Sequence, residues 1–312
     1  MEEGQLAERL RDGNAGTLLE ERGWLVLDNF LDEESATAIL AEARRLCKAR
    51  DRPKGSATYN QHSFKFGGSV LTKPHIYELD LHTECSGMPA AFADLRDNIA
   101  PAVQAAFQLC APFLKLDGSV PATKMQFNAG HGGSFPLHYD NSGSPNRRSL
   151  TCVFYLNPDW KEGDGGEMVL HPFGEKEKII VAPRMRRTVV FRSDLIVHRV
   201  LPSNAERHCF SIWFDGTDTN TKDKQQLTRE HLQFSSWENA ISFFASSPLQ
   251  RVISRAIYRE DYEQSLVESL DKEQAALARG DHARQVQAVL QKLRPLIENI
   301  RERVLPCQEK RI

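Results

Sequence analysis

The residues best suited to chemistry in this chain are His138, Asp140, His198 and Arg207. His138 and Asp140 stand two positions apart, and on a β-strand such residues point to the same face, so both side chains can bind one metal ion. His198, far along the chain, completes a set of two histidines and one carboxylate. That set is typical of Fe(II) held with open coordination positions.

Short β-strands are the elements that must position these residues. Between residues 148 and 216, β-branched and aromatic segments alternate with turns. The predicted strands cover residues 149–157, 167–172, 178–182, 187–191, 196–200 and 208–214. Such regular spacing predicts an antiparallel sandwich or barrel. His138 and Asp140 would lie at the start of this β-roll, and His198 near its end.

Several segments together resemble the 2-oxoglutarate- and Fe(II)-dependent dioxygenases. They are His138-Tyr139-Asp140-Asn141, the run from Thr151 to Trp160, Asp164-Gly165-Gly166-Glu167 and the segment from His198 to Arg207. Within that superfamily the chain is most similar to the prolyl hydroxylases, especially the intracellular oxygen-sensing type. The likeness is close over residues 120–216 and looser over residues 20–120. It implies an α+β fold with a double-stranded β-helix (jelly-roll) core buttressed by N-terminal helices.

The resemblance implies an enzyme that uses Fe(II), with 2-oxoglutarate as cosubstrate and ascorbate as a candidate reductant. His138, Asp140 and His198 would be the metal ligands and the catalytic centre. A substrate C–H bond would be hydroxylated while 2-oxoglutarate and O2 become succinate and CO2. The far carboxylate of 2-oxoglutarate needs a cation, and Arg207 suits it because a guanidinium stays ionised when buried and matches carboxylate geometry. Lys124 is the rival cation.

Other pocket contacts are predicted from their positions in the resemblance. Tyr155 is a second candidate contact for the cosubstrate carboxylate, and a buried structural tyrosine is an equally good interpretation. The chain has Asn128 near the place where prolyl hydroxylases often have a tyrosine, so Gln126 or Asn128 replaces that contact, or neither does. Trp213 lies on the last predicted strand and could wall the substrate pocket, although a core tryptophan is commoner.

His171 and His208 are candidate metal ligands by residue type alone. His171 precedes a proline at a strand end, and His208 directly follows Arg207. His198 agrees with the motif context, so we interpret the other two as non-ligands.

The chain divides into three predicted parts. Residues 1–119 contain a strand at 24–30 and helices at about 33–49 and 89–113, residues 120–216 form the catalytic β-roll, and residues 217–312 form a helical extension. The stretch 50–84 is polar and turn-rich, with a candidate strand at 76–81. In the extension, apolar spacing predicts two helices broken near Gly280-Asp281. They would pack back on the roll or, alternatively, mediate dimerisation.

Composition limits the classes of partner and compartment. The 312 residues carry a net charge of −2, which gives no electrostatic reason to expect nucleic acid or an anionic membrane. No apolar run is long enough to span a bilayer, and the acidic start Met1-Glu2-Glu3 does not resemble a signal peptide. The six cysteines stand singly, without a C-x-x-C pair, which predicts free thiols and a cytoplasmic or nuclear location.

Three functions are compatible with these patterns. The chain hydroxylates a proline in a protein or peptide, or it acts on a small metabolite or another side chain, or it is a silent roll kept for binding. The intact ligand set argues against the silent roll. A metabolite enzyme predicts a closed, charged pocket, and a peptide enzyme predicts an open groove lined by apolar groups such as Trp213.

Overall fold

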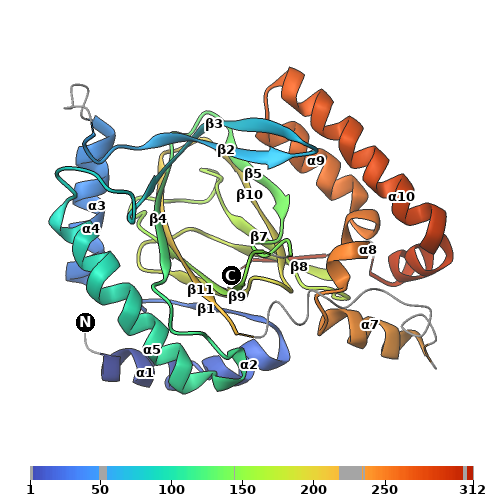
Figure 1. Cartoon of the computed structure of the whole chain (residues 1–312), viewed down its shortest axis with the longest axis horizontal. Coiled ribbons are helices and arrows are strands. Elements are labelled where there is room, and N and C mark those ends of the chain that lie inside the picture. The colour runs from blue at the N-terminus through green and yellow to red at the C-terminus, as the bar shows by residue number, and fades with distance from the viewer. Residues whose placement is uncertain are drawn as a thin grey trace.

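Two β-sheets face each other at the centre of the structure, a computed structural model that describes residues 3–48, 55–143, 145–217, 234, 236–304 and 308–311 (Figure 1). The larger sheet has seven strands in the order β1-β9-β6-β11-β4-β3-β2, and the smaller has five in the order β12-β8-β7-β10-β5. Neighbouring strands are antiparallel except β12 and β8, which are parallel. The strands are β1 (Trp24–Leu27), β2 (Asn60–Phe66), β3 (Ser69–Asp80), β4 (Ala122–Asn128), β5 (Gly133–His138), β6 (Arg148–Tyr155), β7 (Met168–His171), β8 (Glu177–Val181), β9 (Thr188–Arg192), β10 (Val197–Ser203), β11 (Arg207–Asp215) and β12 (Gln308–Arg311).

Alternation along the central strands of the larger sheet divides the apolar residues between its two faces. Phe154 and Phe210 pack with the N-terminal helices, whereas Tyr155 and Cys209 face the smaller sheet. This period of two follows from the pleat of a strand. It turns Arg207, Ser211 and Trp213, at alternate positions of β11, toward the space between the sheets. The predicted α+β jelly-roll fold is confirmed.

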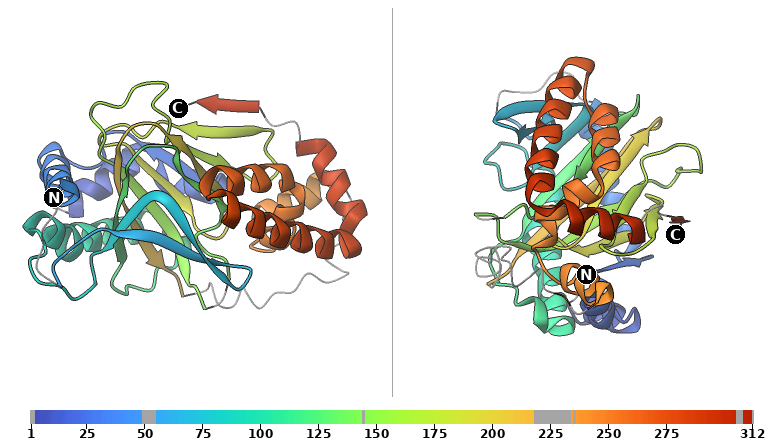
Figure 2. Two further views of the ribbon diagram at one scale, coloured as in Figure 1. Left: turned by 90° about the horizontal axis from the view of Figure 1, so that it is seen from above. Right: turned by 90° about the vertical axis from the view of Figure 1, so that its right-hand side faces the viewer.

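N-terminal helices cover the outer face of the larger sheet (Figures 1 and 2). Asp32 caps the longest of them, because its carboxylate accepts from the Ser35 backbone N–H at 2.7 Å. The predicted helix at 33–49 is therefore found almost at its expected bounds. The one predicted at 89–113 contains a π-helical turn and ends at Cys110. The helical segments are α1 (Glu3–Asp12), α2 (Ala15–Glu21), α3 (Glu33–Lys48), α4 (Ala90–Asp94), η1 (Leu95–Ile99), α5 (Ala100–Cys110) and η2 (Pro112–Leu114).

The C-terminal extension packs back on the roll through α7 (Trp237–Ala245), α8 (Gln250–Ile257), α9 (Arg259–Ser269) and α10 (Lys272–Val304). The predicted break near Gly280-Asp281 is wrong, because α10 runs through both residues and is kinked at Leu293, just before Pro295. A glycine inside a helix costs about 1 kcal/mol, whereas a proline also removes a hydrogen bond and clashes with the preceding turn. No helix among the described residues is long and apolar enough to cross a membrane.

The polar stretch 50–84 forms more strand than the sequence predicts. Instead of a single strand at 76–81, it contains the hairpin of β2 and β3. Gly67 and Gly68 connect the two strands with φ values of +56° and +84°, which suit a tight two-residue hairpin turn. The hairpin crosses the mouth of the roll toward α9, as Figure 1 shows.

Candidate metal and cosubstrate site

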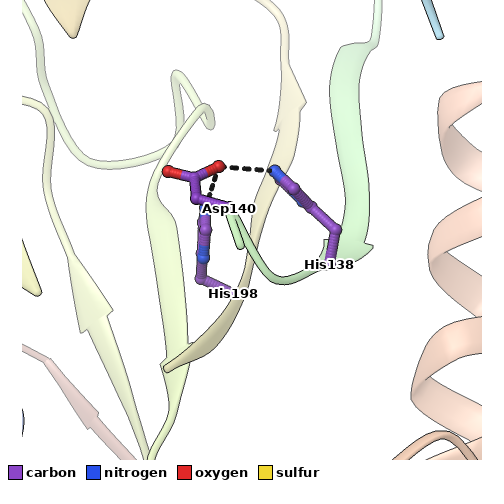
Figure 3. A group of neighbouring side chains, drawn as sticks. All are labelled: His138, Asp140 and His198. Atoms are coloured by element: carbon purple, nitrogen blue, oxygen red, sulfur yellow. Dashed lines mark ion pairs between the residues drawn. The ribbon is translucent and has the colours of Figure 1, made fainter. Parts of the chain in front are cut away.

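His138, Asp140 and His198 converge at one end of the roll (Figure 3). His138 ends β5 and pairs across the ladder with His198 on β10, and Asp140 follows two residues after His138. Asp140 Oδ1 lies 3.4 Å from His138 Nε2 and 3.9 Å from His198 Nε2, and the three ligand atoms are all within 4.8 Å of one another. Neighbouring ligand atoms around an octahedral ion are about 3 Å apart, so this set fits a single ion after a small contraction.

Backbone carbonyls orient both imidazoles. His138 Nδ1 lies 2.8 Å from the Pro136 carbonyl oxygen, and His198 Nδ1 lies 3.2 Å from that of Ile196. Each Nδ1 therefore carries the proton and donates it to the chain, which leaves each Nε2 unprotonated and free to bind a metal.

Asp140 divides its two oxygens between different tasks. Its Oδ1 faces the histidines, whereas its Oδ2 accepts hydrogen bonds from Thr151 Oγ1 and from Trp213 Nε1, both at 2.8 Å. Thr151 and Trp213 stand opposite each other on β6 and β11. They hold the carboxylate so that one oxygen only is presented to an ion. This role of Trp213 differs from the predicted pocket wall, although its ring lines the cavity as well.

The electrostatics of the site favour metal binding. Burial opposes ionisation of Asp140, but the close His138 and His198 imidazoles outweigh it and hold the pKa of the carboxyl well below its usual range. Burial is the main cause that lowers the pKa of His198, to about 4. A charged carboxylate beside neutral imidazoles is the protonation state that a divalent ion requires.

Asn141 positions the loop after the ligands, and the sequence analysis missed it. Its side-chain amide donates to the Arg148 carbonyl at 2.8 Å and accepts from the Gly143 N–H at 2.9 Å. Its backbone N–H donates to the Ser193 carbonyl. A fully buried asparagine in a turn-rich loop is the signal that could have indicated this role.

Arg207 lies at the inner end of the same cavity as the three ligands. It is only 3% exposed, its Nη1 donates to Cys209 Sγ at 3.3 Å, and its Nε has no hydrogen-bond partner. No carboxylate of the described residues lies within ion-pair distance of it. A buried cation without a counter-ion is costly, so the cavity fits an anionic group such as the far carboxylate of 2-oxoglutarate.

Tyr155 lies beside that cation. The Arg207 guanidinium is 5.0 Å from the centre of the Tyr155 ring, and the buried Tyr155 hydroxyl has no hydrogen-bond partner. Burial raises the pKa of Tyr155 to about 12 although Arg207 opposes it, so the hydroxyl keeps its proton and can donate it to an acceptor. The Arg207 guanidinium and the Tyr155 hydroxyl thus suit the binding of one carboxylate at this end of the cavity.

The remaining predicted pocket residues separate into two groups. Gln126 lines the metal cavity, and its Oε1 lies 3.4 Å from Cys209 Sγ. Asn128 stands opposite Arg207 on β4 but is not among the residues that line the cavity, and its side-chain amide donates to the Gly133 carbonyl and accepts from the Gly130 N–H. Contact of Asn128 with the substrate therefore stays a prediction, although both ends of its amide already hold that loop. Lys124, the rival of Arg207, already pairs with Glu78 at 3.0 Å.

The two histidines interpreted as non-ligands lie outside the metal group. Both nitrogens of His171 are buried without partners, and its ring packs on the edge of Tyr258 at 5.7 Å. His208 stacks on Phe127 at 5.0 Å, on the face of the sheet that points away from the ligands.

Comparison with known proteins extends these observations. The sequence pattern of the 2OG-Fe(II) oxygenase superfamily matches residues 123–215. A crystal structure of a prolyl 4-hydroxylase from Phytophthora capsici is 32% identical, with a TM-score of 0.76, over 96% of this chain and 94% of that one. The hypoxia-inducible factor prolyl hydroxylase of Caenorhabditis elegans is 27% identical over 66% of this chain, and human Egl nine homolog 1 is 32% identical over 32% of it.

The matched segments span only 28% of the Caenorhabditis protein and 24% of the human one, so the chain represents a minor part of those two relatives. The Phytophthora protein differs in this respect, because the match covers 94% of its chain. A likeness of this extent and identity goes beyond a shared fold, and the chain therefore belongs to the 2OG-Fe(II) oxygenase superfamily, which uses Fe(II) and 2-oxoglutarate, as a prolyl hydroxylase-like member.

Proposed function

We propose that this protein hydroxylates a proline residue in a protein or peptide, at the expense of 2-oxoglutarate and O2. The observation that carries the proposal is the near full-length likeness to the Phytophthora prolyl 4-hydroxylase, combined with the convergent His138, Asp140 and His198. The division of labour is also proposed: residues 120–216 catalyse, residues 1–119 support the roll, and residues 217–312 extend it.

Each residue of the site has a defined task in this proposal. His138, Asp140 and His198 bind Fe(II), which with 2-oxoglutarate and O2 supplies the oxidising chemistry. Thr151 and Trp213 fix the carboxylate rotamer of Asp140. The cavity beside the ligands reaches Arg207, so a cosubstrate anchored there extends toward the metal position.

Arg207 and Tyr155 receive the far carboxylate of 2-oxoglutarate, one as a fixed cation and the other as a hydroxyl donor. The apolar side chains around them exclude water, because Val153, Met168 and Val200 line the same cavity. Exclusion of water strengthens the contact between charges and protects the reacting groups from side reactions.

A second candidate function is hydroxylation of a small acidic metabolite. It is favoured by the cations in the cleft before the metal, because Lys73, Arg148 and Arg255 all line that cavity. The same cleft also presents the aromatic rings of Phe64, Phe66 and Trp213, which suit a peptide. The cleft thus combines features predicted for the two substrate classes.

The test is incubation of the purified protein with Fe(II), 2-oxoglutarate and a proline-containing peptide library, followed by mass spectrometry. We expect peptides that gain one oxygen atom on proline, and succinate in equal amount. Asp140→Ala, which lacks the carboxylate ligand, is the matched inactive control. Succinate formation stimulated by metabolites and never by any peptide would contradict the peptidyl proline assignment.

A further inference from the structure

A cavity of about 440 Å³ lies in front of the metal ligands, between the β2–β3 hairpin, the mouth of the roll and the C-terminal helices. The hairpin closes one side, because the Thr72 backbone N–H donates to Gln274 Oε1 of α10 at 2.7 Å and Leu71 packs against Leu266. Figure 1 shows the hairpin reaching across to α9. Residues far apart in the sequence, including α8 outside the segment that matches the superfamily, therefore form one wall.

Six basic side chains line this cavity, and three of them, Lys73, Arg148 and Arg255, each rest on an aromatic ring. Lys73 Nζ lies 4.1 Å from the centre of the Phe135 ring and 4.8 Å from that of Phe64. The Arg148 guanidinium lies 4.3 Å from the centre of the Trp213 ring. Rings on one side hold a cation in place and leave its other side open to a ligand.

Arg255 of α8 is the third cation. Its guanidinium lies 4.4 Å from the centre of the Tyr262 ring and 5.2 Å from that of Phe66. Its Nη1 donates a hydrogen bond to His282 Nδ1 at 3.2 Å, a neutral acceptor. The guanidinium therefore keeps its full charge toward the cavity.

None of the three cations pairs with a carboxylate within 4.0 Å among the described residues. The acids of the cavity are otherwise engaged: Glu78 pairs with Lys124, and Asp140 belongs to the metal set. Lys73 is only 5% exposed, and burial lowers its pKa to about 7 although Glu78 and Asp140 oppose the shift. An anion that entered the cavity would offset the cost of burying the Lys73 charge.

We propose that this cleft selects an acidic ligand, and that Lys73, Arg148 and Arg255 bind carboxylates carried by the substrate on either side of the bond that is hydroxylated. This inference rests on the proposed function and specifies its substrate class as an acidic peptide segment around the target proline. Positive charge distributed around the cavity makes the substrate's charge, beyond its proline, a determinant of specificity. Arg255 would thus be a specificity-determining residue that lies in the C-terminal extension.

The test compares two sets of proline peptides that differ only in the flanking residues, Asp and Glu in one and the isosteric Asn and Gln in the other. Binding is measured by fluorescence anisotropy with the protein loaded with Mn(II) and N-oxalylglycine, an unreactive stand-in that blocks the cosubstrate site. We expect the acidic set to bind at least about tenfold more tightly, and the gap to shrink as salt is added.

Variants test whether Lys73 and Arg255 cause the preference for acidic peptides. Arg255→Gln and Lys73→Met should each reduce the gap several-fold, and Arg255→Glu should shift the preference toward peptides with basic flanks. Arg279→Gln is the matched control, because Arg279 pairs with Glu263 outside the cavity and should leave the gap unchanged. Equal binding of the two peptide sets, or a gap insensitive to both Arg255 and Lys73, would overturn the inference.

Further outcomes separate this inference from the function on which it rests. If acidic and amide peptides are hydroxylated equally well, the prolyl hydroxylase proposal stands and the charge selection is wrong. If a free tricarboxylate such as citrate binds with the same dependence on Arg255 while no peptide binds, the acidic-ligand inference stands and the peptide substrate is wrong.

Discussion

Replacement of Arg207 tests the cosubstrate end of the site. Arg207 is 3% exposed and has no carboxylate partner among the described residues, so we propose that it binds the far carboxylate of 2-oxoglutarate. Removing one partner of a buried ion pair costs about 3–5 kcal/mol, and each factor of ten in affinity corresponds to about 1.4 kcal/mol. Arg207→Met should therefore raise the KM for 2-oxoglutarate at least about a hundredfold.

The assay measures succinate formation against 2-oxoglutarate concentration, and calorimetry gives the binding constant on the Mn(II)-loaded protein. Metal stoichiometry should stay unchanged, because Arg207 contacts none of the three ligands. Lys124→Met is the matched control, since Lys124 pairs with Glu78 and should not affect the 2-oxoglutarate requirement. An unchanged KM in Arg207→Met, or a raised KM in Lys124→Met alone, would refute the assignment.

The same variant also gives a prediction for thermal stability. Although it loses affinity for 2-oxoglutarate, it should not lose stability. A buried cation without a counter-ion destabilises the fold, so the methionine variant without 2-oxoglutarate should unfold at the same temperature as the parent protein or higher. Added 2-oxoglutarate should raise the Tm of the parent and not that of the variant. A large loss of Tm in the variant would show that Arg207 is structural.

Three further predictions concern the metal and a distant ion pair. Asp140→Ala should abolish binding of one Fe(II) per chain while the circular dichroism spectrum is kept, and retained stoichiometric iron would contradict the ligand set. Trp213→Phe removes the Nε1–H donor to Asp140 and leaves Thr151 as donor, so metal affinity should fall about 10–100-fold in a chelator titration; an unchanged affinity would make Trp213 a pocket wall only. The hydrogen bonds from Arg187 lower the pKa of Asp28 below 3.8, so this carboxylate stabilises the fold above about pH 4 and the effect is lost as pH falls through the lowered value. Asp28→Asn should thus have a lower urea midpoint than the parent at neutral pH and the same midpoint at the acid end, and a constant difference would contradict this.

The parts of the fold that could be predicted are those specified by local sequence patterns. The run Thr151 to Leu156 alternates between the two faces of the larger sheet, and the cap Asp32 precedes a regular helical stripe. The hairpin of β2 and β3 was predicted only in part, as a strand at 76–81. Strand β2 is polar and has no buried residue, and the buried positions of β3 do not keep a strict alternation. Only Gly67 and Gly68 marked its turn.

The residues of the candidate site that belong to a local sequence motif could be predicted. His138 ends β5 and Asp140 lies two residues beyond it, and the alternation of β11 takes Arg207 to the interior. The supports of these residues come from elsewhere: Thr151 reaches Asp140 only when β6 and β5 are folded together. Lys73 and Arg255 come from segments that no motif connects, and only the folded chain brings them into one cavity.

Two buried arginines show why a sequence cannot distinguish a structural cation from a ligand-binding one. Arg187 is 5% exposed and makes a two-pronged ion pair with Asp28, 159 positions away in the sequence, at 2.7 and 2.9 Å. Arg207 is as deeply buried and is the first residue of β11, whereas Arg187 directly precedes β9, and Arg207 contacts only a thiol, an aromatic ring and a cavity. Their residue type and local pattern are alike, so the difference lies in the position of one distant carboxylate. Arg207 has no carboxylate partner among the described residues, so we propose that its partner is a bound ligand. By the same reasoning we expect the charges of the substrate to bind at Lys73, Arg148 and Arg255.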